Sequence, residues 1–183
     1  LVSGAESVMF LNGLITNDMK TLALNSWMPA AFANVQGRLL AAVRIMHRED
    51  GFLIDTEPAT RDTVIGLLNK YTLAGDFHLA DLTDQMTIFS VQGKRAAEVI
   101  SNVLGEASSV QRQKVGTAVV GDIAVTLIRA THTAEDGFDL FLAGSNSAEL
   151  AKMLTAGGAT PGASDTAEPP RLEAGISVSG TDM

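Results

Sequence analysis

The sequence predicts an α+β fold made of two consecutive units, each built on a mainly antiparallel sheet. Apolar runs of strand length alternate with short polar turns, amphipathic helical segments lie among them, and the pattern restarts near residue 86. With 46% apolar and 19% charged residues, a chain of 183 residues has enough apolar side chains to bury a core. We therefore expect a first unit over residues 1–85 and a second over residues 86–183.

The first unit is expected to contain two helices and a three-stranded meander. The segment AESVMFLNGLI has apolar residues at helical spacing, and the polar turn TNDMKTL follows it. The meander consists of three apolar runs with turn residues between them: WMPAAFANV, LLAAVRIMH and GFLIDTE. Pro58 then opens a second helix, in which Val64, Ile65, Leu68 and Tyr71 share one face. The run FHLADLT is interpreted as a closing strand.

The second unit is expected to repeat this mixture of strands and helices. The segment MTIFSVQG is predicted to be a strand, and KRAAEVISNVLG is predicted to be a helix that ends at Gly105. A hairpin around Gly121-Asp122 joins two strands in TAVVGDIAVTLIRA. The strand FDLFLA and the amphipathic helix SAELAKMLTAGG follow, and the remaining residues, rich in Gly, Pro and small side chains, indicate an irregular connection.

Composition excludes several classes of function. A net charge of -8 disfavours a protein that coats nucleic acid, because phosphate binding needs a clustered excess of Lys and Arg. The chain has no cysteine, and its three histidines, His47, His78 and His132, do not have the spacing of metal ligands. No apolar run is long enough to span a bilayer, and the N-terminus lacks the basic start of a signal peptide. We therefore expect a cytoplasmic protein without a metal site, and the start at Leu1 suggests a piece of a longer chain.

The segment FANVQGR separates two runs that otherwise have the pattern of buried strands. Gly37 can adopt a positive φ or let the backbone approach a ligand, and Asn34, Gln36 and Arg38 would project around that corner. An ordinary hairpin turn with solvated polar side chains explains the same composition. Composition favours the turn over the ligand site.

Three further segments carry polar groups with two interpretations. Asn17 in the TND turn can contact a ligand or form an Asx turn. The acidic segment AEDGFD, which contains Asp139, can do acid–base chemistry, bind a cation or form a solvated loop. Arg171 in PPRLEAG can clamp a carboxylate or lie on the surface. The chain has no phosphate-binding loop, no GxGxxG after a strand, no GxSxG and no HExxH, so the common nucleotide and hydrolase mechanisms have no basis here.

Taken in order, several motifs resemble the folate-binding YgfZ and glycine-cleavage T-protein superfamily over nearly the whole chain. They are FLNGLITNDMKTL, FANVQGR, LNKY, FSVQG, EDGFDLFL and RLEAGISVSGTDM. The NVQGR form and LNKY are more similar to the YgfZ branch, which is implicated in maintaining iron–sulfur clusters and in tRNA modification that depends on them. Either the KGCYxGQE motif of that branch lies beyond Met183, or the chain is a divergent member without it.

The resemblance implies the first two domains of a three-domain ring around a central tetrahydrofolate channel, without the barrel-like C-terminal domain. The family's folate-binding Gly-aromatic-acid segment corresponds to Gly137, Phe138 and Asp139, so the resemblance implies that Phe138 and Asp139 bind folate, with Asp139 as the pterin-binding carboxylate. The RLEAG arginine of the family corresponds to Arg171. The channel wall would include Asn17, Asn34, Gln36 and Arg38. The T-protein's paired aspartates correspond to Ala41 and Ala42, which argues against aminomethyl transfer and leaves no catalytic residue to assign.

Three functions follow from these observations. The leading expectation is a tetrahydrofolate-binding, YgfZ-like protein that supports iron–sulfur cluster assembly or repair and dependent tRNA modification. The alternatives are a folate-dependent aminomethyltransferase and a non-catalytic interaction module that has lost its ligand. The expected partners are a reduced folate and iron–sulfur assembly or client proteins, with no direct contact to nucleic acid or membrane, and a monomer is the expected working unit.

Overall fold

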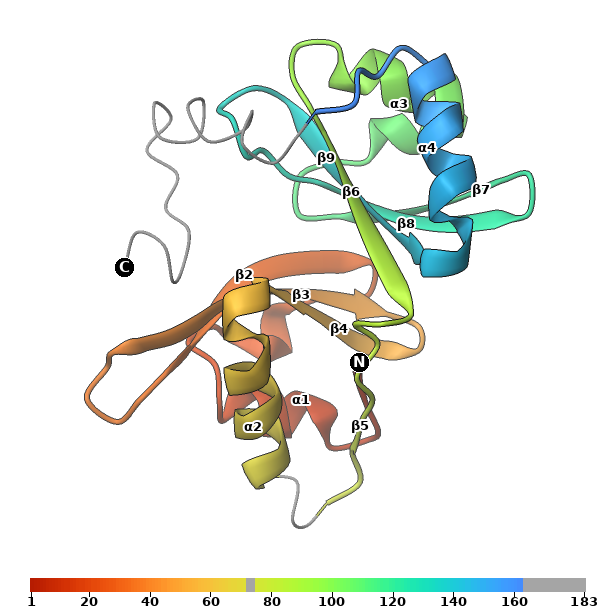
Figure 1. Ribbon diagram of the computed structural model, residues 1–183. Coiled ribbons are helices and arrows are strands. Elements are labelled where there is room, and N and C mark those ends of the chain that lie inside the picture. The colour runs from red at the N-terminus through yellow and green to blue at the C-terminus, as the bar shows by residue number, and fades with distance from the viewer. Residues whose placement is uncertain (72–74, 163–183) are drawn as a thin grey trace. The chain divides into compact units, whose positions relative to one another are not determined.

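A computed structural model of the chain describes residues 1–71 and 75–162 (Figure 1). The chain divides into two compact units, one over Leu1–Leu82 and one that begins at Thr83. Both sheets are antiparallel, which confirms the predicted α+β class. No helix in the described part of the chain is long and apolar enough to cross a membrane.

The first unit has a five-stranded sheet with two helices on one face. Its strands are β1 (Val2–Ser3), β2 (Ser26–Ala33), β3 (Leu39–Arg48), β4 (Gly51–Thr56) and β5 (His78–Leu79), in the order β2-β3-β4-β1-β5. The helices are α1 (Ser7–Asn12) and α2 (Arg61–Tyr71), with single 3-10 turns at Met19–Thr21 and Pro58–Thr60. The predicted meander is confirmed as β2, β3 and β4. Helix α1 is shorter than predicted, and the expected closing strand is reduced to the two residues of β5.

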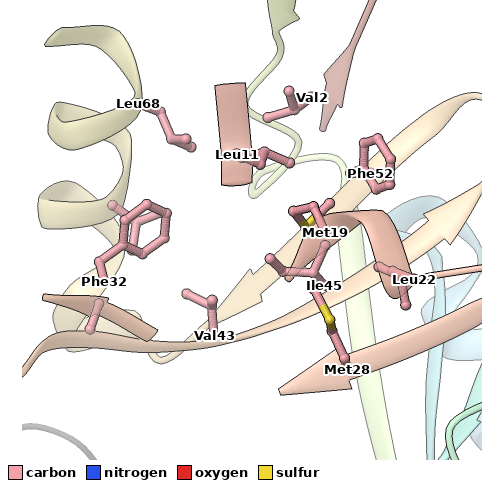
Figure 2. Close-up of a cluster of buried hydrophobic side chains, with 12 residues drawn as sticks. Val2, Leu11, Met19, Leu22, Met28, Phe32, Val43, Ile45, Phe52 and Leu68 are labelled. Atoms are coloured by element: carbon pink, nitrogen blue, oxygen red, sulfur yellow. The ribbon is translucent and has the colours of Figure 1, made fainter. Parts of the chain in front are cut away.

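Apolar side chains alternate along the strands of the first unit and point to one face of the sheet. The two helices cover this face. Phe32, Val43 and Ile45 point toward Leu11 of α1 and Leu68 of α2, and all five side chains are buried (Figure 2). Each fully buried aliphatic or aromatic side chain contributes about 1.5–3 kcal/mol to folding through apolar surface removed from water. This packing holds β2 and β3 in register up to the FANVQGR corner.

The second unit has a four-stranded sheet with two helices packed on one face (Figure 1). Its strands are β6 (Met86–Gln92), β7 (Val115–Val120), β8 (Ile123–Arg129) and β9 (Gly137–Ala143), in the order β6-β9-β8-β7. The helices are α3 (Ala96–Leu104), followed by a 3-10 turn over Gly105–Ser109, and α4 (Ser147–Ala156), preceded by one over Gly144–Asn146. The hairpin predicted at Gly121-Asp122 is confirmed as the turn between β7 and β8.

Strand β9 is the last described strand of the second unit in sequence and lies inside the sheet, between β6 and β8. Phe138 and Leu140 belong to the core that α3 and α4 cover, and both are 0% exposed. Because successive strand residues point to opposite faces, Asp139 projects from the face that these helices leave uncovered. The alternation of side chains along β9 therefore places the Asp139 carboxylate on an inner strand of the sheet.

Candidate functional site

Asp139 is a buried carboxylate on the face of the second sheet opposite α3 and α4. It lies opposite Ser90 of β6 and Ile128 of β8 and is 1% exposed. Burying a carboxylate in an apolar environment is costly unless the charge is paired and hydrogen-bonded. The contacts of its two oxygens therefore decide what this site can bind.

His132 contacts both oxygens of Asp139. Its Nε2 lies 3.1 Å from Oδ1 and 2.9 Å from Oδ2. An ionised carboxylate only accepts hydrogen bonds, so the Nε2–H of His132 is the donor in this pair. The His132 side chain is 40% exposed while that of Asp139 is 1% exposed, so the imidazole lies between the buried carboxylate and solvent.

Gln92 fixes the backbone around His132. Its Oε1 accepts a hydrogen bond from the His132 backbone N–H at 2.9 Å. Its Nε2 donates to Ser90 Oγ at 2.9 Å and to the Ala130 carbonyl at 3.1 Å. An added Cβ on Gly137 would lie 2.2 Å from Gln92 Oε1, so glycine is required there for Gln92 to keep its place. Four polar residues thus form one connected cluster: Ser90, Gln92, His132 and Asp139.

The loop that carries His132 is anchored at its far end by an ion pair. Arg129 Nε donates to Asp136 Oδ1 at 2.8 Å, and Arg129 Nη2 donates to Asp136 Oδ2. The hydrogen bonds from Arg129 lower the pKa of Asp136, so this carboxyl stays ionised and the pair persists into the acidic range. The Asp136 carbonyl also accepts a hydrogen bond from Gly93 N at 2.9 Å, which joins the loop to the end of β6.

The FANVQGR corner in the first unit is a hairpin turn organised by Asn34. Asn34 Oδ1 accepts hydrogen bonds from Gln36 N at 3.0 Å and from Arg38 N at 2.9 Å. Gly37 has a φ of +78°, which explains why glycine occupies this position. The Gln36 and Arg38 side chains are exposed, and Val35 is 99% exposed. The turn is therefore self-contained and leaves Gln36 and Arg38 available at its tip.

Asn17 ties the TND turn to the neighbouring strand. Its Nδ2 donates to the Pro29 carbonyl of β2 at 2.9 Å, and its Oδ1 accepts from Asp18 N at 2.9 Å. Asp18 in turn accepts from Lys20 N through Oδ1 at 2.9 Å. Both amide groups of Asn17 are thus used in shaping the turn.

The two alanines of β3 lie on opposite faces of the first sheet. Ala41 is 0% exposed and belongs to the core, while Ala42 is exposed on the other face. Arg44 follows on the face of Ala42 and pairs with Asp55 of β4, with Arg44 Nε 2.8 Å from Asp55 Oδ2. The pairing of β3 with β4 places the Asp55 carboxylate on the same face as Ala42.

The structure places the residues predicted from sequence in separate groups. Asn17, Asn34, Gln36 and Arg38 lie in the first unit and Asp139 in the second, while Phe138 lies in the helix-covered core on the face opposite Asp139. Arg171 is outside the described residues. Sequence reasoning missed His132 and Gln92, although both lie in motifs with recognisable polar residues, THTAEDGFD and FSVQG. Within residues 1–71 and 75–162, no cluster of His, Asp and Glu is arranged to hold a metal ion.

Comparison with known proteins places the chain among relatives of two kinds. It is 28% identical to an aminomethyltransferase of Rubrobacter xylanophilus over 182 residues, covering 98% of this chain and 49% of that protein. It is 26% identical to the tRNA-modifying protein YgfZ of Escherichia coli O157:H7 over 134 residues, covering 73% of this chain and 39% of that protein. The chain thus spans about half of the length of the aminomethyltransferase and less of YgfZ.

The fold has a counterpart among solved structures. The glycine cleavage system aminomethyltransferase T from Bartonella henselae superposes with a TM-score of 0.81 at 19% identity, covering 97% of this chain and 48% of that one. The GCVT N-terminal domain family matches residues 1–183, the full length of the sequence. The chain therefore belongs to the GCVT N-terminal domain family.

Proposed function

We propose that this chain is the reduced-folate-binding part of a YgfZ-like protein that supports iron–sulfur cluster assembly or repair and dependent tRNA modification. The observation that carries the proposal is the Asp139 carboxylate, which is 1% exposed and has both oxygens within hydrogen-bond distance of His132 Nε2. Such a carboxylate is suited to a ligand edge that presents two adjacent N–H donors. The pterin ring of tetrahydrofolate presents such an edge, with a ring N–H beside an exocyclic amino group.

The other described residues proposed to bind folate lie in the first unit. Arg38 is exposed at the tip of the β2–β3 hairpin, and the glutamate tail of folate carries carboxylates that a guanidinium binds. Gln36 beside it offers an amide, whereas Asn34 and Asn17 act through the turns that they hold. In this proposal Phe138 contributes by packing β9, and Arg171 is a further contact to the ligand.

The YgfZ role is favoured over aminomethyl transfer by the absence of carboxylates at positions 41 and 42. The family's paired aspartates stand near the reactive folate nitrogen, and the methyl groups of Ala41 and Ala42 neither accept a proton nor hold a cationic amine. The presence of Asp139 without that pair of aspartates supports binding of folate without transfer of a one-carbon unit to it.

Replacing Asp139 with alanine is expected to weaken binding of 5-formyltetrahydrofolate about tenfold to a hundredfold, because a hydrogen bond to a charged group contributes about 1.5–3 kcal/mol. Isothermal titration calorimetry on the protein at its full natural length measures this effect. Asp139→Glu keeps the carboxylate and should retain much of the affinity. Asp122→Ala, at the exposed β7–β8 turn of the same unit, should bind as the unsubstituted protein does.

Two results would contradict the folate proposal. One is the absence of both binding heat and thermal stabilisation when the folded protein is mixed with reduced folates. The other is an Asp139→Ala variant that binds 5-formyltetrahydrofolate as tightly as the parent. Circular dichroism of each variant shows whether its fold is retained.

Aminomethyl transfer is the second candidate, and the position of Asp55 is the observation that favours it. Asp55 supplies a carboxylate on the face of Ala42, but Arg44 is hydrogen-bonded to it. We expect no release of ammonia or methylene-tetrahydrofolate when an aminomethylated carrier protein is supplied. Release that disappears in Asp55→Asn would instead establish the enzyme. Introducing Ala41→Asp tests whether the family's aspartate alone restores the reaction.

A further inference from the structure

Strand β7 lies at one edge of the second sheet (Figure 1). In the order β6-β9-β8-β7, its partner among the described strands is β8 alone. In an antiparallel sheet, every second residue of an edge strand points its backbone N–H and C=O groups away from the sheet. Half of the six residues of β7 therefore present backbone groups that a further strand can pair with.

The sequence of β7, VGTAVV, contains no feature that protects an edge strand from association. Natural sheets protect their edges with very short strands, charged side chains, proline or bulges. In the first sheet, the edge strand β2 contains Pro29 and a register shift between Phe32 and Ala33, and the other edge, β5, has only two residues. Strand β7 has neither charge nor proline and pairs with β8 through six consecutive residues. Its outer edge is thus suited to receive another strand.

Apolar side chains of β7 are incompletely covered on both faces of the sheet. Ala118 and Val120 pack against the core under α3 and α4 but are only partly buried. Thr117 and Val119 alternate with them and point to the other face, where Val119 is 74% exposed. A strand placed beside β7 would cover side chains on both faces, and such cross-strand pairs stabilise a sheet.

Opposite charges flank the two ends of β7. Lys114 directly precedes the strand, and Asp122 follows it after one turn residue. Two copies of β7 that pair antiparallel about a two-fold axis through Ala118 place Thr117 of one copy opposite Val119 of the other. In this register Lys114 of each copy lies opposite Asp122 of the other, so two pairs of opposite charge meet. The edge is therefore complementary to itself in charge as well as in backbone pairing.

We propose that β7 is a self-association edge, through which two copies of the chain join their second sheets into one continuous antiparallel sheet. The occupant is a second copy because the flanking charges complement each other under this two-fold pairing. Strand β6, the other edge of the sheet, also lacks charge, but Lys94 beyond its end already pairs with Glu135 at 3.8 Å. The pairing departs from the monomer expected from sequence. It is independent of the proposed folate function, since β8 and β9 are adjacent and β8 separates β7 from the strand that carries Asp139.

Self-association is expected to be reversible and to depend on protein concentration. An interface built on one pair of short strands is small, and interfaces below about 1,200 Å² are typical of transient complexes. Sedimentation equilibrium of the protein at its full natural length should therefore give a monomer–dimer equilibrium with a Kd of about 10–100 μM. Val119→Lys puts a charge on the edge and should raise this Kd about tenfold. Val35→Lys, at a side chain 99% exposed in the first unit, should leave the Kd unchanged.

Charge reversal tests the register. Lys114→Glu and Asp122→Lys each create two pairs of like charge in a dimer of identical copies, so each should raise the Kd about fivefold to tenfold. Mixing the two variants restores both pairs of opposite charge, and should therefore restore association. The double variant Lys114→Glu/Asp122→Lys should associate as the parent does. Thermal unfolding at low protein concentration checks that each variant is folded.

Amide hydrogen exchange locates the interface. In the dimer, the amides of β7 that point outward should exchange more slowly as the protein concentration rises. Slow exchange of these amides at every concentration would show that another segment of the full-length protein covers the edge, and would overturn the proposal.

Three results of the sedimentation series also count against the edge pairing. A mass that stays at that of the monomer at every concentration overturns the proposal. A mass that rises beyond that of the dimer indicates pairing of β7 with β6 in open chains and overturns the two-fold register. A dimer that tolerates both Val119→Lys and the charge reversals uses another surface and overturns the assignment to β7. A dimer that Val119→Lys weakens, and that mixing of the charge variants restores, supports it.

Discussion

Replacing Phe138 with alanine is expected to lower the free energy of unfolding of the second unit by about 3–5 kcal/mol, the usual cost of removing a buried phenylalanine ring. The ring is 0% exposed in the core under α3 and α4, and the Arg129 guanidinium lies 5.6 Å from its centroid. The substitution therefore leaves a cavity and removes a cation–π contact. Urea titration followed by amide NMR signals of β8 and β9 measures the loss.

Two variants serve as controls for this expectation. Phe138→Leu keeps much of the side-chain volume and should cost less than half as much. Val119→Ala, in β7 of the same unit, removes a side chain that is 74% exposed and should change stability by less than about 0.5 kcal/mol. Stability unchanged by Phe138→Ala would show that the ring does not support this core.

Gly51→Ala is expected to destabilise the first unit by about 2–4 kcal/mol, because a positive φ and a backbone clash act together. Gly51 has a φ of +126°, and a Cβ there would lie 2.4 Å from the Val2 carbonyl oxygen and 3.2 Å from Ser3 Cα. Both atoms belong to the backbone of β1, which pairs with β4. The clash with an added Cβ can therefore be removed only if β1 shifts. Thermal unfolding followed by circular dichroism measures the loss.

Gly37 provides a matched control in the other hairpin of the same sheet. It also has a positive φ, +78°, but an added Cβ would meet nothing within 4 Å. Gly37→Ala should therefore cost only the conformational strain, about 1–2 kcal/mol. If Gly51→Ala and Gly37→Ala lower the stability equally, the close approach of β1 to Gly51 does not contribute to the cost of Gly51→Ala.

Local sequence signals predicted most of the elements because their causes are local. The turn at Gly121-Asp122 and the FANVQGR corner follow from residues that favour tight turns, and the strands beside them follow from apolar runs. The run FHLADLT was predicted as a full strand but forms only His78–Leu79. Its sole partner in the described sheet is the two-residue strand β1, so the ladder is short.

The partners of the candidate site depend on contacts that sequence patterns do not reveal. Asp139 was singled out from its motif, and its role in folate binding remains a prediction. Gln92 reaches the site only because β6 pairs with β9, which is distant in sequence. His132 reaches Asp139 through a loop in which Ala134 has a φ of +62°, a conformation that composition does not predict for alanine.

The position of β9 in its sheet also has a consequence for the order of events during synthesis. Strand β6 has β9 as its only described partner in the sheet, and the two lie about fifty residues apart, so β6 emerges from the ribosome with an unsatisfied edge. The hairpin of β7 and β8 forms from neighbouring residues, whereas Ser90 and Asp139 meet only when β9 inserts between β6 and β8. Nascent chains that end before Gly137 should therefore depend on chaperones, and ligand added during translation should protect only chains in which β9 has been inserted.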